Sequence, residues 1–355
     1  MRIGVDVSDL CTNRADGTTR YTKELAKRLP ELGSQQEWHY FAPSRLPARQ
    51  AGGENIQWHA SPWPKFWTQA RLPVDLWRYP VDRLFMPIQQ LPIFRPRKTK
   101  TVAVIHDLAC HEFGEQYGYK DWLLLQTFSA QVAREADDII CVSRATANDV
   151  EKYYGRTKEV RVIYHGVDQE KFVGSGDKYP DLHKPYILFV GQIQPRKNLA
   201  RLMEAFEILA GANKDLQLVI AGGHGWLQEP ILNKAKKSGV ANRIKLLGRV
   251  PDEKLPALYA NAEVFVLPSL QEGFGMPILE AFACGTPVVT SNVSCMPEIA
   301  GGAAVLVDPH EVESIAAGIE EAMDNRGSLI EKGKKRAGEF SWEKTARETL
   351  EVLTK

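Results

Sequence analysis

Short apolar, β-branched runs alternate with segments of helical periodicity through the second half of the chain. Residues 186–190 and 216–221 are two such runs. Between them, residues 199–210 place their apolar side chains on one helical face: Leu199, Leu202, Met203, Phe206 and Leu209. Further strands are expected at 244–247, 264–267, 287–290 and 304–307. This alternation of strands and helices predicts a parallel sheet with helices on both faces.

The first half repeats the alternation with longer interruptions. Strands are expected at 2–7, 39–41, 83–85, 101–105, 138–142 and 160–164, and helices at 19–28, 121–135 and 145–153. A polar stretch, 170–184, separates the two halves and is typical of a linker. We therefore expect domains at 1–170 and 185–340, a linker at 171–184, and an amphipathic terminal helix at 341–355.

Composition narrows the class of protein. The chain has 355 residues, of which 44% are hydrophobic and 25% charged, so disorder is excluded as its main state. A net charge of +1 gives no overall basic field, and we expect no nucleic-acid partner. The five cysteines include no CxxC pair, which argues against a disulfide framework or a zinc site. With no signal-peptide pattern and no apolar run near the ~18 residues of a bilayer span, we expect a cytoplasmic protein with at most peripheral membrane contact.

One segment stands apart from this average composition. Residues 58–80 hold four of the eight tryptophans, and a basic run follows at Arg95, Arg97, Lys98 and Lys100. One interpretation is a peripheral membrane or lipid-acceptor surface. The other is a packed helix beside a solvated basic loop, and the pattern alone leaves both open.

Chemistry is expected just after the strands, because open parallel sheets bind ligands at the carboxyl ends of their strands. After residue 190 come Gly191, which permits a tight turn, and the cations Arg196 and Lys197. Asn198 is a favourable N-cap for the helix that begins at Leu199. Two cations beside the start of a helix favour an anion such as phosphate, although a solvated basic loop would look the same.

The stretch 268–289 is the most informative. Glu272 and Glu280 flank a loop containing Gly273 and Gly275, where a ligand can approach the backbone. Pro277 favours a helix start, Gly285 its end, and the first-turn amides of Ile278 and Leu279 would be free for phosphate oxygens. Carboxylates, amides and cations together suit a nucleotide sugar. Two surface acids near a helix start are the simpler alternative.

These residues carry a resemblance to a known family. The stretch EGFGMPILEAFACGTPVV resembles the Glu-x7-Glu motif of the family 4 glycosyltransferases, with Glu272 and Glu280 as its acids. FVGQIQPRKNL is similar to the family's donor-phosphate loop, and LLGRVPDEKLPALY to the segment that leads to the nucleotide base. IHDL, CVSRAT, IYHGVD and FSWEKTARETLEVL follow the family's remaining landmarks in the expected order.

The resemblance implies an α/β fold of the GT-B type. Two Rossmann-like parallel-sheet domains would face each other across a cleft, with the C-terminal helix crossing back to the N-terminal domain. The N-terminal domain would bind the acceptor and the C-terminal domain the nucleotide sugar. Family members retain the configuration of the transferred sugar and generally need no metal ion, so neither a metal nor another cofactor is expected.

Site roles follow from the same resemblance. Glu280 would bind the ribose, and Glu272 the transferred sugar. Arg196 and Lys197 would neutralise the diphosphate, and His106 would face the sugar. The other donor-binding positions would be Gly17, Gly191, Val250, Gly273, Phe274, Gly275, Ile278 and Leu279.

Four positions need comment. Gln192 stands where many relatives have Arg, and Gly17 stands where they have paired glycines. His165 replaces a commoner Asn, and we interpret it as structural. His106 has a simpler alternative as a core histidine.

The resulting hypothesis is a retaining hexosyltransferase of bacterial surface polysaccharide synthesis. Its first expected donor is GDP-mannose and its second UDP-glucose, and its acceptor would be a glycan or a lipid-linked glycan. It would act in the cytoplasm or at the inner face of the plasma membrane. Two alternatives stay open: a sugar-nucleotide epimerase of the same fold, and a non-catalytic nucleotide-sugar-binding protein. A dinucleotide dehydrogenase is disfavoured because no GxGxxG follows the first strand.

Overall fold

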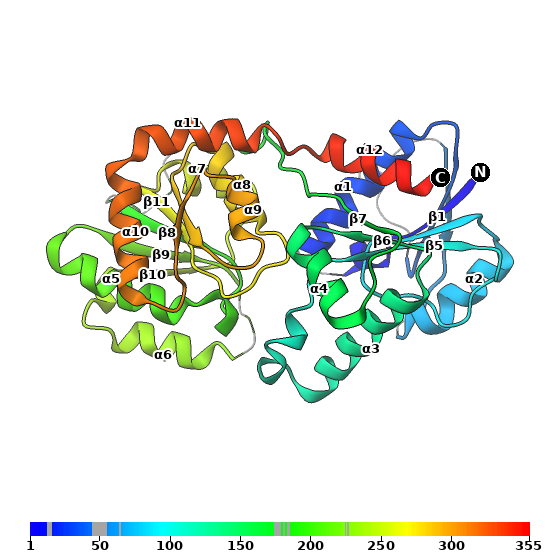
Figure 1. Cartoon of the computed structure of the whole chain (residues 1–355), viewed down its shortest axis with the longest axis horizontal. Coiled ribbons are helices and arrows are strands. Elements are labelled where there is room, and N and C mark those ends of the chain that lie inside the picture. Colours follow the sequence, from blue (N-terminus) through cyan, green and yellow to red (C-terminus); the bar gives the residue numbers. More distant parts are fainter. Residues whose placement is uncertain are drawn as a thin grey trace. The chain divides into compact units, whose positions relative to one another are not determined.

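A computed structural model gives the fold of the chain (Figure 1) and describes residues 1–12, 16–44, 55–63, 65–173, 179, 182, 185–223, 225 and 227–355. The chain divides into two compact units. Unit 1 comprises Met1–Glu112, Tyr119–Gly166 and Trp342–Lys355, and unit 2 comprises Phe113–Gly118 and Val167–Ser341. Most of the expected linker 171–184 lies outside the described residues.

The described part of unit 1 is built on a seven-stranded parallel sheet in the order β3-β2-β1-β4-β5-β6-β7. Its strands are β1 (Arg2–Asp6), β2 (Glu37–Ala42), β3 (Ile56–Ala60), β4 (Arg83–Met86), β5 (Lys100–Ile105), β6 (Asp138–Cys141) and β7 (Val160–Val162). Its helices are η1 (Ser8–Cys11), α1 (Gly17–Leu32), η3 (Trp67–Arg71), α2 (Leu72–Arg78), η4 (Ala109–His111), α3 (Tyr119–Glu135), α4 (Arg144–Tyr154) and α12 (Trp342–Leu353).

Unit 2 is built on a six-stranded parallel sheet in the order β10-β9-β8-β11-β12-β13. Its strands are β8 (Tyr186–Val190), β9 (Gln217–Ala221), β10 (Ile244–Gly248), β11 (Val264–Leu267), β12 (Val288–Ser291) and β13 (Val305–Val307). Its helices are η5 (Gly114–Gln116), η6 (Pro195–Lys197), α5 (Leu199–Ala212), α6 (Glu229–Lys237), η7 (Ala241–Arg243), α7 (Leu255–Ala260), α8 (Met276–Ala283), α9 (Met296–Ala300), α10 (Val312–Asp324) and α11 (Arg326–Ala337).

Both sheets are doubly wound, with helices on either side (Figure 1). The central strands are apolar along their whole length because both of their faces are covered, as in β11, whose four residues are all buried. The predicted strands are confirmed apart from small shifts at their ends. β3 was missed, because it is an edge strand of mixed polarity in which only His59 is buried. The α/β fold of two Rossmann-like domains is confirmed.

Each sheet has one point at which the order of its strands reverses. The order of strands reverses between β1 and β4 in unit 1, and between β8 and β11 in unit 2. In unit 2, Ile187 and Leu188 of β8 pair with Val264 and Phe265 of β11, so both strands end at the same edge. Such a reversal leaves a crevice at the carboxyl ends of the two strands, where ligands of doubly wound folds bind.

The terminal helix α12 belongs to unit 1 although it follows unit 2 in sequence. Trp342 at its start is 2% exposed and stacks on His165 with ring centroids 5.7 Å apart. Thr345 donates a hydrogen bond to the Tyr164 carbonyl at 2.7 Å. The amphipathic face expected at 341–355 is therefore buried against unit 1.

We predict that Trp342→Ala destabilises the protein by about 3–5 kcal/mol, because it removes a large side chain that is buried at the start of α12. Urea unfolding followed by circular dichroism measures the loss. Trp77→Ala is the matched control, since Trp77 lies in the same unit with 67% of its surface exposed and should change stability by no more than about 0.5 kcal/mol. Equal losses in the two variants would contradict the docking of α12.

Candidate functional site

The candidate site of unit 2 lies at the carboxyl ends of β8 and β11. The loop 191–198 follows β8, and the loop 268–275 follows β11. These two strands are neighbours at the reversal of strand order. The two segments singled out in the sequence therefore come together where the fold places ligands.

The loop after β8 is fixed by backbone contacts with the segment after β9. The Gly191 amide donates to the Ala221 carbonyl at 2.9 Å, and the Ile193 amide donates to the Gly223 carbonyl at 3.2 Å. A Cβ at Gly222 would lie 1.8 Å from the Gly191 carbonyl oxygen, so only glycine permits this approach. The loop thus presents η6, with its two cations, from a fixed base.

Asn198 differs from the expectation for a helix cap. Its backbone is left-handed, with φ of 61°, and its side chain makes no capping hydrogen bond to α5. Its side-chain amide donates instead to the carbonyls of Pro268, at 3.0 Å, and Pro309, at 2.6 Å. Asn198 thus occupies the predicted N-cap position of α5, but its side chain joins two loops instead of capping a helix-start amide.

The cations and the first carboxylate of the motif form one buried cluster. The carboxylate of Glu272 is hydrogen-bonded to Lys197 Nζ, and its other oxygen lies 3.3 Å from Arg196 Nη1. Ser269 Oγ donates to the same carboxylate at 2.7 Å, and Arg196 Nη1 also donates to the Gln271 carbonyl at 2.8 Å. Lys197 is 8% exposed and Glu272 7%. Two cations and one carboxylate leave the cluster with a net charge of +1.

The electrostatics of Glu272 reflect this pairing. Burial raises the pKa of Glu272, but the charges of Lys197 and Arg196, with hydrogen bonds from Lys197 and Ser269, outweigh it. The pKa therefore lies below the ordinary value of 4.5, and the carboxylate is ionised at neutral pH.

The backbone of Glu272 is held by residues that the sequence did not single out. Ser294 Oγ donates to the Glu272 carbonyl at 2.8 Å and accepts from the Glu272 amide at 3.3 Å. The Cys295 thiol donates to the same carbonyl at 3.2 Å. Ser294 and Cys295 follow β12, the strand beside β11, so the only signal available was a polar residue after a neighbouring strand.

The helix start predicted in the motif is confirmed, with one correction. α8 begins after Gly275, whose φ of 83° favours glycine, and Pro277 lies in its first turn. Gly285 follows its end in the left-handed region, with φ of 75°. The Ile278 amide, however, donates to the Gly275 carbonyl at 2.9 Å, so the prediction that it is free was wrong. The short first turn of the helix uses it.

Glu280 lies within α8 and is 6% exposed. The buried Tyr259 hydroxyl donates to its Oε2 at 2.9 Å. Tyr259 is itself fixed, because Thr286 donates to its carbonyl at 2.7 Å. Sequence analysis assigned Tyr259 no role, since its contact with Glu280 depends on how α7 packs beside α8.

The remaining candidates in unit 2 lie around these loops. Phe274 is buried, with its ring 6.1 Å from that of Phe340. Val250 is 8% exposed and follows β10, whose Gly248 carbonyl accepts a hydrogen bond from Gly222 at 2.8 Å. Their roles, and those of Gly273, Gly275 and Leu279, stay predictions.

His106 and Gly17 belong to unit 1. His106 follows β5, and its Nε2–H donates to the Pro87 carbonyl at 2.8 Å, which leaves Nδ1 as the ring's acceptor. Burial lowers the pKa of His106, so the ring is neutral at neutral pH. Gly17 is the first residue of α1, which Asp16 caps by accepting from the Thr19 amide at 3.0 Å.

His165 lies in an aromatic cluster with Tyr21, His106 and Trp342. Its ring is 4.8 Å from Tyr21 and 5.7 Å from Trp342, and Tyr21 meets His106 edge-on at 5.1 Å. Burial lowers the pKa of His165 well below 6.5. A buried neutral ring packed among aromatic side chains agrees with the structural interpretation of His165.

No metal centre appears in the part of the chain that the structure describes: no three His, Cys, Asp or Glu side chains gather there in a way that could hold an ion. Across the same residues, no helix is both long and apolar enough to cross a bilayer.

Two family models match the chain in succession. The model for Glycosyltransferase Family 4 matches residues 15–171, and the model for Glycosyl transferases group 1 matches residues 177–339. The chain belongs to the family 4 glycosyltransferases. The two matches together span residues 15–339 apart from 172–176.

Curated relatives include two mannosyltransferases of Escherichia coli. The O-antigen chain mannosyltransferase B is 38% identical over 177 residues, which are 49% of this chain and 46% of that protein. The serotype-specific mannosyltransferase WbdA is 31% identical over 273 residues, which are 72% of this chain and 33% of that protein. The aligned part of this chain thus spans about half, or less, of the length of these relatives.

Solved structures share the fold. Sucrose-phosphate synthase from Thermosynechococcus elongatus superposes with a TM-score of 0.79 at 19% identity, covering 99% of this chain and 98% of that one. Anabaena Alr3699/HepE, solved in complex with UDP-glucose, gives a TM-score of 0.75 at 18% identity, covering 100% and 99% of the two chains.

We predict that Glu272→Gln lowers the free energy of unfolding by about 3–5 kcal/mol at neutral pH, because it leaves the buried Lys197 and the half-buried Arg196 without their carboxylate. The folded-state pKa of Glu272 is depressed, so the wild-type advantage is complete above pH 4.5 and is lost as pH falls through that folded pKa.

Urea unfolding of the two proteins across this pH range measures the difference. Glu331→Gln, an exposed position on α11, serves as the control and should match the wild type throughout. A difference between wild type and Glu272→Gln that does not change with pH would contradict the ion-pair account.

Proposed function

We propose that this chain is a retaining glycosyltransferase that moves a hexose from a nucleotide sugar to a glycan or lipid-linked acceptor. One observation carries the proposal: the Lys197–Glu272–Arg196 cluster lies at the reversal of strand order in unit 2. A buried cluster with net charge +1 at that place suits a diphosphate, and its carboxylate suits sugar hydroxyls.

The chemistry follows from charge. Breaking the bond between sugar and phosphate develops negative charge on the nucleoside diphosphate and positive charge on the sugar. Lys197 and Arg196, already fixed by Glu272, stabilise the leaving phosphate without rearranging, and one such preorganised donor is worth about 3–4 kcal/mol. A released phosphate oxygen takes the proton of the acceptor hydroxyl, which then attacks from the same face and so retains the configuration.

In this proposal, the carboxylates of Glu272 and Glu280 bind different parts of the donor. Glu272 accepts hydrogen bonds from the hydroxyls of the transferred sugar, with amides of Gly273, Phe274 and Gly275 beside it. Glu280, oriented by Tyr259, accepts from the ribose. The Gly191 loop and the backbone near Val250 line the rest of the donor. No metal or other cofactor takes part.

His106 acts as a neutral positioning group in this mechanism. Its Nε2–H is committed to Pro87, so Nδ1 is available to accept a hydrogen bond from a sugar hydroxyl. Gly17, at the start of α1, allows the phosphates to approach closely.

GDP-mannose is the first proposed donor, which the mannosyltransferase names of the E. coli relatives support. UDP-glucose is the second, supported by the Alr3699/HepE complex. Synthesis of a surface polysaccharide fits the first relative's name, O-antigen chain mannosyltransferase B. We place the reaction in the cytoplasm, in keeping with five free cysteines.

We predict that a panel of GDP-, UDP- and ADP-sugars raises the thermal midpoint with one donor only, and that the bound donor is slowly hydrolysed. Lys197→Ala should lower that hydrolysis by about 10²–10³-fold, because it removes one cation from the leaving group. Lys245→Ala, an exposed position on β10, is the control and should keep full activity.

The products of this assay decide between the hypotheses. Release of free sugar and nucleoside diphosphate supports the transferase, whereas an epimerised nucleotide sugar without release would identify an epimerase. Binding without turnover for every acceptor tried would identify a non-catalytic binding protein.

We predict that kcat/KM shows no ionisation of His106 at or above pH 6.5, because burial lowers the pKa of His106 from 6.5 and the neutral ring is the working form. His106→Asn, which keeps a hydrogen-bonding side chain, should retain donor affinity while lowering kcat. An ionisation near pH 6.5 that is present in the wild type and absent in His106→Asn would show instead that His106 works as a titrating base.

A further inference from the structure

A short helical segment of unit 1 packs one face into the core. It consists of η3 followed directly by α2. Leu72 and Leu76 are fully buried, and Trp67 donates from its indole to the buried Asp6 carboxylate at 3.1 Å. The inner side of the segment is therefore packed in the core of unit 1, as the packed-helix interpretation of 58–80 expected.

The outer side of the same segment is apolar as well. A helix on a protein surface normally turns polar residues outward, so exposed apolar side chains in a row are unusual. Exposed apolar residues recur here at spacings of four, four and three, and we call them the outer stripe: Phe66, which directly precedes η3, with Ala70, Val74 and Trp77. Phe66 is 79% exposed and Trp77 67%.

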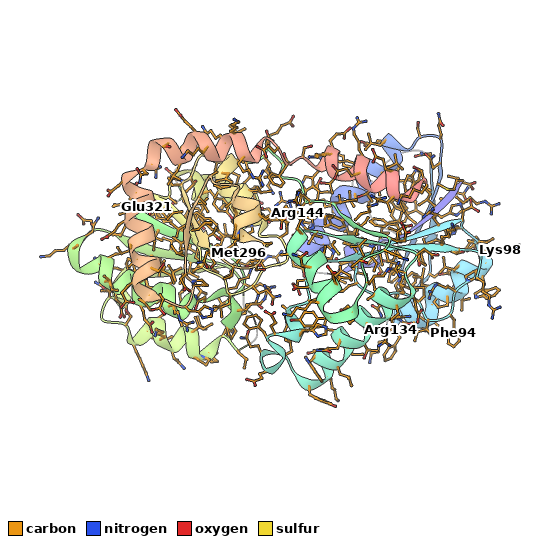
Figure 2. The ribbon with its side chains drawn as sticks, viewed as in Figure 1. Phe94, Lys98, Arg134, Arg144, Met296 and Glu321 are labelled. Atoms are coloured by element: carbon orange, nitrogen blue, oxygen red, sulfur yellow. The ribbon has the colours of Figure 1, made fainter. Side chains whose placement is uncertain are left out.

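A neighbouring loop extends this apolar surface. Gln69 of η3 donates to the Leu91 carbonyl at 2.8 Å and accepts from the Ile93 amide at 3.0 Å, which holds the loop against the helical segment. Ile93 and Phe94 in that loop are exposed. Figure 2 shows Phe94 and, four residues on, Lys98 at the margin of unit 1.

The charge around the outer stripe is strongly positive. Between residues 61 and 100 there are eight Lys or Arg (65, 71, 78, 83, 95, 97, 98, 100) against two Asp (75, 82), although the whole chain carries only +1. Asp75 is fully buried and forms a bidentate pair with Arg71, and Asp82 accepts from the Arg2 amide at 2.7 Å. Arg83 and Arg95 are paired with Asp138 and Glu135, so the local excess of positive charge rests on exposed cations such as Lys65, Arg78 and Lys98.

A cavity of about 360 Å³ opens on the same segment, lined by Trp58, His59, Ala60, Ser61, Pro62, Arg71, Arg78 and Tyr79. Arg71 is held in place by Asp75 and by donating to Ser61 Oγ at 2.9 Å. The guanidinium of Arg78 lies 5.4 Å from the centre of the Tyr79 ring, on which His59 stacks at 4.0 Å. Burial, more than the neighbouring His39, lowers the pKa of His59 to about 4, so its ring is neutral. Because Asp75 balances the charge of Arg71, Arg78 sets the charge of the cavity.

Arg71 and Arg78 both line this cavity, and each directly follows a residue of the outer stripe in the sequence. Guanidinium groups bind phosphate oxygens well, and aromatic side chains favour the interfacial region of a bilayer. Apolar side chains, exposed cations and an arginine-lined cavity thus occur together on one helix.

We propose that unit 1 docks on an anionic lipid bilayer through the outer stripe and the Ile93–Phe94 loop, and that the cavity takes the phosphate of one lipid headgroup. This goes beyond the proposed transferase activity and is tested without donor or acceptor, so either proposal can fail alone. The local charge favours an anionic bilayer over a neutral one, and each cation near such a surface should raise binding about fivefold.

Vesicle flotation tests the proposal with the full chain. Wild-type protein should float with phosphatidylcholine vesicles containing about 30% phosphatidylglycerol and not with phosphatidylcholine alone. The double variant Phe66→Ser, Trp77→Ser should lose binding, and Arg78→Glu should lower it about tenfold or more. All three positions are exposed, so the variants should keep the wild-type circular dichroism.

Matched controls come from unit 2. Ile208→Ser removes an apolar side chain that is 51% exposed on α5, and Lys332→Glu reverses an exposed charge on α11, and both should float like the wild type. Soluble glycerol 3-phosphate distinguishes a free phosphate ligand: binding of this compound, abolished by Arg78→Glu, without any flotation would overturn the proposal. So would flotation that is equal in all variants, or a dimer that the Phe66→Ser, Trp77→Ser variant converts to monomer without vesicle binding.

Discussion

The buried carboxylate of Glu272 is the interaction on which the candidate site depends. An ionised carboxylate in the interior costs several kcal/mol unless cations and hydrogen bonds compensate it. Lys197 and Arg196 come from the loop after β8, and Glu272 comes from the loop after β11. The ion pairs of the Glu272 carboxylate therefore hold both loops together at the reversal of strand order. Asn198 adds a second tie between the same loops through the Pro268 carbonyl. The cations are consequently positioned before any anion arrives, which is the condition for efficient stabilisation of a leaving phosphate.

Much of this site could be predicted from the sequence, because its signals are local. Gly191 and the cations follow an apolar strand, and Pro277 and Gly285 delimit α8 through their own backbone preferences. What could not be predicted depends on the order of strands in space. Glu272 meets Lys197 across 75 residues of chain only because β8 and β11 are neighbours. Tyr259 meets Glu280 for a similar reason, since α7 packs beside α8, and neither pair leaves a periodic trace in the sequence.

Unit 1 shows the same division between what local pattern reveals and what packing decides. The tryptophans and the basic run of 58–100 were visible, but not which side of the helix faces inward. The structure buries Trp67, Leu72 and Leu76 and leaves Phe66 and Trp77 in solvent, so the segment is both a packed helix and an apolar surface. β3 escaped prediction because an edge strand with polar and apolar residues on both faces has no clear alternation. An average charge near zero concealed two positive sites, one in each unit.

The most direct test of the central claim is the binding of a nucleoside diphosphate compared with its bare nucleoside. Calorimetry would measure GDP and guanosine, or UDP and uridine, against the wild type and Lys197→Ala. If Lys197 holds the diphosphate, the substitution lowers the affinity for the nucleoside diphosphate by about tenfold or more, the effect of a charge-assisted hydrogen bond. The affinity for the bare nucleoside stays unchanged. An equal loss for both ligands, or no loss for either, would contradict the placement of the diphosphate at the Lys197–Glu272–Arg196 cluster.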